Sequence, residues 1–157
     1  MCFGSLAIAW GADDAAAPRS VAFDTALNGN SGFDSHGEDV IYTLSDGNTL
    51  LTAATAGGRT VFTVRLDETG AGTWTYTQTD ALDHPPGADP IALNLGFVAT
   101  DGDGDTATGA IAITVNDDTP VLVGTVTSGL TLDEDDLADG NDNSDPDALQ
   151  VTGNLAI

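Results

Sequence analysis

The chain has 157 residues, of which 25 are Asp or Glu and only 3 are Lys or Arg, so its formal charge at pH 7 is −22. This charge excludes nucleic acids and anionic membrane surfaces as partners, because both require a cationic protein surface. No stretch is long and apolar enough to insert into a membrane, and no Sec-type signal opens the chain.

Hydrophobic residues alternate with polar ones at a period of two, which predicts β-strands and no long helix. Strands are expected, in chain order, at residues 5–10, 40–44, 48–53, 62–66, 73–77, 91–97, 111–115 and 121–126. The pair at 62–66 and 73–77 predicts a hairpin, since the residues between them, Asp67-Glu68-Thr69-Gly70-Ala71-Gly72, are typical of a turn. Residues 24–39 are rich in Gly, Asn and Ser, so we expect a loop there.

The spacing of these strands predicts an all-β fold, an antiparallel β-sandwich of the Ig-like or cadherin-like kind. Gly4-Ser5-Leu6-Ala7-Ile8 recurs as Gly153-Asn154-Leu155-Ala156-Ile157, an offset of 153 − 4 = 149 residues. That period is the size of a domain. We therefore expect residues 1–126 to be one repeat unit, and 127–157 to be an acidic junction followed by the first strand of the next repeat.

The junction holds eight acidic residues between 131 and 147 and no basic one. A flexible acidic linker remains an equal alternative for this stretch. We expect residues 151–157 either to lack a partner or to pair with a neighbouring molecule by strand addition.

The sharpest motif is the run Asp101-Gly102-Asp103-Gly104-Asp105 between two expected strands. Three carboxylates at alternate positions, with glycines between them, can curl around one hard cation, and Ca²⁺ prefers several oxygen ligands. The run is no EF-hand loop, because residue 106 is Thr at the position of the conserved turn glycine and the flanks are strands. The alternatives are a β-turn calcium site and a plain acidic turn.

Two further acidic pairs are candidate ligands. Asp117 and Asp118 follow the last strong strand and could complete a site with acids of the junction, whose 139–143 stretch resembles the calcium-binding linker of cadherins. Asp13 and Asp14 are the other candidate, for which a solvated turn is the alternative.

Nothing in the sequence predicts an enzyme. Only His36 and His84 are present as histidines, no serine lies in a nucleophile-elbow motif, and the single cysteine is Cys2. Trp10, Trp74 and Tyr76 could form a carbohydrate-binding platform, although such aromatics more often belong to the core. A ligand-binding module for carbohydrate or protein is therefore the alternative to a structural module.

The order of these motifs resembles the tandem repeat domain of very large repeats-in-toxin adhesins, which are exported by type I secretion. The resemblance is carried by residues 4–14, the 60–79 hairpin, and the motifs at 82–85, 97–107 and 117–120. It implies a secreted or cell-surface bacterial protein of adhesion and biofilm formation, whose neighbouring repeats are its partners. It also implies calcium-dependent rigidity, with metal ligands at Asp101, Asp103, Asp105, Asp117 and Asp118, and no catalytic residues.

Overall fold

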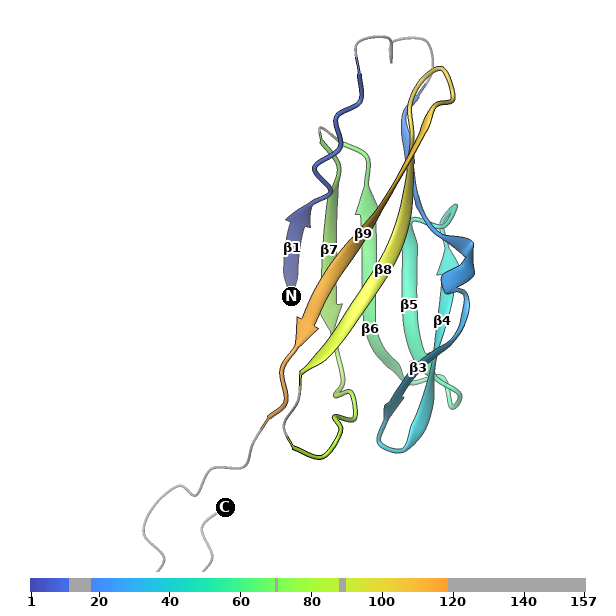
Figure 1. Cartoon of the computed structure of the whole chain (residues 1–157). Helices are drawn as coiled ribbons and strands as arrows, with labels where there is room; N and C mark the ends of the chain where they lie inside the picture. The colour runs from blue at the N-terminus through green and yellow to red at the C-terminus, as the bar shows by residue number, and fades with distance from the viewer. Residues whose placement is uncertain (12–17, 70, 88–89, 119–157) are drawn as a thin grey trace, which may run out of the picture. The chain divides into compact units, whose positions relative to one another are not determined.

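The computed structural model describes residues 1–11, 18–69, 71–87 and 90–118 (Figure 1). Over these residues the protein is all-β and its strands form two antiparallel sheets, so the predicted sandwich class is confirmed. The described elements belong to one compact unit, Met1–Asp117. The strand expected at 121–126, the pair Asp13 and Asp14, the repeated segment at 153–157 and the boundary expected after residue 126 lie outside the described residues.

Within the described residues, one sheet has six strands and the other has three. The larger sheet runs in the order β1 (Cys2–Ser5), β7 (Thr73–Gln78), β6 (Thr60–Asp67), β5 (Leu50–Thr55), β4 (Glu38–Ser45) and β3 (Gly29–Ser35). The smaller sheet runs in the order β2 (Ser20–Phe23), β8 (Ile91–Thr100) and β9 (Thr106–Val115). A short 3-10 helix, η2 (Thr25–Leu27), links β2 to β3.

The hydrophobic core lies between the two sheets and draws on both. Along β8 every second residue from Ile91 to Ala99 is buried, which places that face of the strand against the larger sheet. Phe62 of β6 is fully buried between Tyr42 and Tyr76, with ring centroids 5.7 and 5.2 Å away. Burial raises the pKa of Tyr76 to about 12, because a phenolate in this core would lose its hydration.

The loop expected at 24–39 is wrong, because β3 runs from Gly29 to Ser35 and β4 begins at Glu38. β3 is an edge strand whose residues alternate between half-buried and exposed up to the buried Ser35, and only Phe33 among them is large and apolar. The period of two in this strand is therefore hard to recognise in the sequence, because most of its residues are Gly, Asn or Ser. His36 and Gly37 both have positive φ, 52° and 75°, as a two-residue hairpin turn requires.

The strand expected at 5–10 is displaced toward the N-terminus, since β1 covers Cys2–Ser5. Ala7 has a φ of 56°, which turns the backbone out of the regular ladder. The N–H groups of Leu6 and Ile8 nevertheless donate to the carbonyls of Gly72 and Ala71, both at 2.9 Å, so this segment continues beside the turn that precedes β7. The strands expected at 40–44, 48–53, 62–66, 73–77, 91–97 and 111–115 are confirmed as β4 to β9, with different ends, and β2 was not predicted.

The part of the chain that the structure describes contains no helix long and apolar enough to cross a bilayer.

Candidate metal centre

The candidate metal centre is the turn that joins β8 to β9. These two strands pair without interruption from Ile91–Val115 to Thr100–Thr106, which makes them the longest hairpin among the described strands. Residues 101–105 therefore lie at one end of the sandwich, at the top of Figure 1. The hairpin fixes both ends of the turn, so the acidic residues between them have little freedom to separate.

The turn is closed by its own backbone and by the first aspartate. The N–H of Asp101 donates to the carbonyl of Asp105 at 3.0 Å. The Asp101 carboxylate accepts from the N–H groups of Gly104 and Asp105, at 3.2 and 2.8 Å. Gly104 has a φ of 101°, a conformation that a residue with a Cβ rarely adopts. The sequence pattern of Asp and Gly thus produces a compact loop.

The three carboxylates of the turn converge. One ligand oxygen from each of Asp101, Asp103 and Asp105 lies within 4.8 Å of the others; Asp101 is half-buried and the other two are exposed. The hydrogen bond to Asp101 and the like charges of its neighbours raise the pKa of Asp103. The same hydrogen bond, together with backbone N–H groups of the turn, lowers the pKa of Asp101. A proton therefore relieves the repulsion here, and a divalent cation would relieve it more completely.

The second predicted acidic pair lies elsewhere. Asp117 and Asp118 follow the other end of β9, about 30 Å along an extended strand from the turn. The Asp117 carboxylate is 3.6 Å from Nδ1 of His84. These two aspartates therefore cannot share an ion with the β8–β9 turn. Any site that they form would be a separate one.

The aromatic residues considered as a carbohydrate platform pack into the fold. Tyr76 is buried, and Trp10 and Trp74 are half-buried against the core. The guanidinium of Arg19 lies 5.1 Å from the centre of the Trp10 ring. Side chains packed in this way contribute to the stability of the fold.

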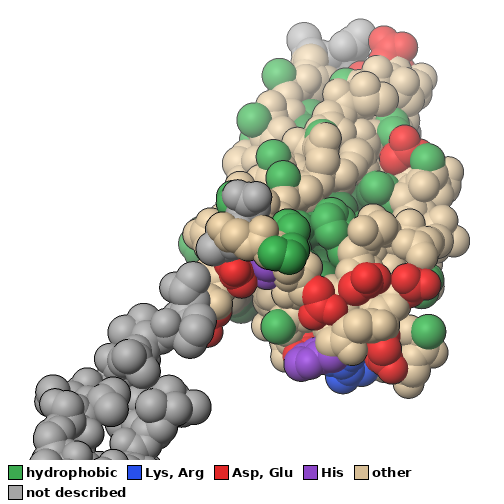
Figure 2. Space-filling view, turned by 60° about the horizontal axis from the view of Figure 1, so that its bottom comes forward, with side chains coloured by type: hydrophobic (Ala, Val, Ile, Leu, Met, Phe, Trp, Pro, Cys, Tyr) green, Lys and Arg blue, Asp and Glu red, His purple; other side chains and the backbone are tan. Residues whose placement is uncertain are grey.

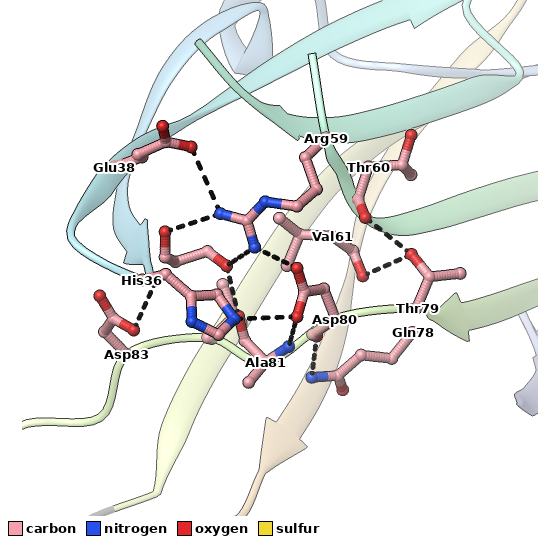
Figure 3. A network of polar contacts seen from close by, with 12 residues as sticks. His36, Glu38, Arg59, Thr60, Val61, Gln78, Thr79, Asp80, Ala81 and Asp83 are labelled. Carbon is pink, nitrogen blue, oxygen red and sulfur yellow. Dashed lines mark hydrogen bonds and ion pairs between the residues drawn. The ribbon is translucent and has the colours of Figure 1, made fainter. Parts of the chain in front are cut away.

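At the opposite end of the sandwich, charged residues form a network that the sequence analysis did not anticipate (Figure 3). Arg59 forms ion pairs with Asp80 and Glu38, and its guanidinium also donates to the carbonyl of Ser35 at 3.1 Å. Ser35 is fully buried, and its hydroxyl donates to the carbonyl of Ala81 at 2.6 Å. Figure 2 shows acidic, basic and histidine side chains gathered on this end of the molecule.

The same network holds the β3–β4 turn. The Asp83 carboxylate accepts from the N–H groups of His36 and Gly37, at 2.8 and 2.7 Å, which lowers the pKa of Asp83. Hydrogen bonds from the His36 ring, the Ala81 N–H and Arg59 lower the pKa of Asp80 to about 2. The network ties the β3–β4 turn to the segment after β7, so we interpret it as a structural brace. The one sequence feature that bears on this network is the small number of basic residues, 3 Lys or Arg in the whole chain.

The model of the family described as "Domain of unknown function (DUF5801)" matches residues 3–114, and the chain belongs to this family. No curated protein and no solved structure matches the chain.

Proposed function

We propose that this member of the DUF5801 family is a calcium-stabilised extender module in the tandem array of a large bacterial secreted or surface adhesin. The observation that carries the proposal is the convergence of Asp101, Asp103 and Asp105 at the tip of the longest described hairpin. A turn that collects three carboxylates in a chain of charge −22 is unfavourable unless a cation compensates for it.

Calcium would act by removing this repulsion. At neutral pH the three carboxylates face each other within 4.8 Å, and a bound Ca²⁺ would fix all three relative to the turn backbone. Extracellular modules bind Ca²⁺ with dissociation constants of about 0.1–1 mM, so millimolar extracellular calcium would occupy even a weak site. In the cytosol, where free calcium is scarce, the same turn would remain destabilised, which suits a chain exported before it folds.

The tandem arrangement is supported by the sequence. The G-x-L-A-I phrase recurs after 149 residues, and the family model matches residues 3–114, which include the first occurrence and end before the second. The order of motifs resembles the repeats of repeats-in-toxin adhesins, which favours a secreted or cell-surface location and neighbouring repeats as partners. A rigid sandwich in series would hold a distal adhesive region away from the cell.

A ligand-binding module is the second candidate, and one feature favours it. A hollow between the N-terminal segment and β9 is lined by Leu6, Trp74, Phe97 and Ile111, among others. The apolar side chains in its lining could contact the face of a sugar ring or an apolar peptide side chain. Saturable binding of a glycan to the wild-type chain, lost in Trp74→Ala, would favour this candidate over the extender.

Calorimetric titration tests the calcium site directly. We expect Ca²⁺ to bind the chain with a dissociation constant of about 0.1–1 mM, and Mg²⁺ to bind at least tenfold more weakly. Asp101→Asn together with Asp103→Asn should abolish the component assigned to the turn. The matched control is Asp67→Asn with Glu68→Gln, which removes two charges from the β6–β7 turn. If both pairs reduce binding equally, the carboxylates act only as a diffuse charged surface.

A further inference from the structure

The edge of β7 is a seat for the N-terminal strand, and a glycine is required there. Gly4 pairs with Trp74 and Ser5 pairs with Thr73. A Cβ on residue 4 would lie 2.6 Å from the Trp74 indole, a distance that real side chains do not tolerate. The indole therefore packs directly on the Gly4 backbone. A larger residue at position 4 must displace either the Trp74 indole or the strand itself.

The seat continues past the end of β1. The N–H groups of Leu6 and Ile8 donate to the carbonyls of Gly72 and Ala71, and both side chains lie on Gly72. A Cβ on Gly72 would lie 2.9 Å from Ile8 Cδ1 and 3.0 Å from Leu6 Cδ1. We call this surface the β7 seat: the β7 edge at residues 73–76 with the backbone of residues 71 and 72. The residues that contact it are a glycine, a leucine and an isoleucine, at positions 4, 6 and 8.

The chain carries a second segment with the same features, at residues 153–157. Glycine, leucine, alanine and isoleucine recur at the same positions, and only Ser5 is replaced, by Asn154. The Ser5 hydroxyl accepts from the N–H of Ala7 at 3.0 Å, and an Asn side-chain oxygen makes the same bond to the residue two positions on. The residues that correspond to Cys2 and Phe3 are Val151 and Thr152, which favour strands.

We propose that the β7 seat is a receptor for G-x-L-A-I segments and that residues 153–157 are its second ligand. In the proposed array, which this inference uses only for its biological setting, residues 153–157 would occupy the seat of the unit that follows. The backbone hydrogen bonds and the Gly, Leu and Ile contacts seen for residues 4–8 are available to the second segment, which lacks only the bond from the Ser5 hydroxyl to the Gly72 carbonyl at 3.3 Å. Exchanging one segment for the other therefore costs little. The tethered segment 4–8 has an effective concentration in the millimolar range, so it fills the seat of the isolated unit.

A peptide tests the proposal when both internal segments are disabled. The receptor is the full chain carrying Gly4→Val and Gly153→Val, and the probe is a fluorescein-labelled peptide of residues 149–157, followed by fluorescence polarisation in EDTA. We expect saturable binding, at least tenfold weaker for the same peptide with Gly153→Val, and competition by a peptide of residues 1–9. Binding of the 1–9 peptide without binding of the 149–157 peptide would refute the proposal.

Disulfide trapping keeps the test decisive if the Gly4→Val receptor does not fold. The Cα partner of Phe3 is Thr75, and the residue that corresponds to Phe3 is Thr152. In a Cys2→Ser background, we expect Thr75→Cys with Thr152→Cys to form a disulfide at least tenfold faster than the control pair Thr43→Cys with Thr152→Cys. Equal rates would overturn the proposal. Because EDTA is present throughout, failure here is distinguishable from failure of the calcium site.

Discussion

Replacing Gly109 by alanine should destabilise the sandwich through a single steric conflict. Gly109 of β9 lies opposite Phe97 of β8, and a Cβ on residue 109 would be 2.6 Å from Phe97 Cζ and 2.8 Å from Cε1. Phe97 is only 7% exposed, so its ring cannot swing away into solvent. Either the ring must shift inside a packed core or the two strands must separate.

Overpacking of this kind costs about 1–3 kcal/mol of unfolding free energy. For a domain of this size that corresponds to a fall in melting temperature of about 4–15 °C. Urea unfolding followed by tryptophan fluorescence measures the loss. The matched control is Gly96→Ala on the facing strand, where a Cβ would be 3.6 Å from Asp24 Cβ, an ordinary contact. We expect Gly96→Ala to be neutral or to stabilise by up to about 1 kcal/mol.

If Gly109→Ala unfolds at the same urea concentration as Gly96→Ala, the Phe97 ring is not fixed against Gly109 and the reasoning is wrong. Both variants should retain any stabilisation by calcium, because the acidic turn lies beyond the Thr100–Thr106 pair and distant sites contribute additively.

Three further predictions concern the charged groups. Asp103→Asn removes the carboxyl whose pKa is raised by its neighbours, so the melting temperature in EDTA at pH 7 should rise or stay unchanged. The rise in melting temperature on adding calcium should become smaller in this variant. An equally large rise would exclude Asp103 as a ligand. The pKa of Asp80 is lowered to about 2 from 3.8, so its contribution to stability is present above pH 4 and is lost as the pH falls toward 2. Asp80→Asn should be less stable than the wild-type chain at pH 7, and its melting temperature should fall less between pH 4 and pH 2. The same dependence of melting temperature on pH in both proteins would contradict this. Asp83→Ala should accelerate amide hydrogen exchange of His36 and Gly37 at least tenfold while leaving β8 unaffected, and unchanged exchange at the turn would argue against the brace.

Local patterns account for the parts of the fold that could be predicted. From Phe62 to Leu66 in β6 and from Ile91 to Phe97 in β8, large apolar residues alternate with small or polar ones, so the period is visible in the sequence. β3 was missed because an edge strand with few apolar side chains has a composition similar to that of a loop. β2 has four residues, too few to establish a period.

The same distinction holds for the candidate sites. Asp101, Asp103 and Asp105 were identified together because the geometry of one short turn brings them together, and no distant contact is needed. The brace around Arg59 joins residues separated by 21 to 24 positions, so it depends on strand order and register. The seat for Gly4 likewise became visible only when the structure placed Trp74 against its backbone.

The most direct test of the account is the thermal unfolding of the full chain in EDTA, in 10 mM CaCl₂ and in 10 mM MgCl₂. A parallel series uses the variant in which Asp101, Asp103 and Asp105 are all replaced by Asn. The account predicts that calcium raises the melting temperature of the wild-type chain by about 5–10 °C, that magnesium does so much less, and that most of the calcium effect is lost in the variant. Equal melting temperatures in EDTA and calcium, or an undiminished rise in the variant, would contradict it.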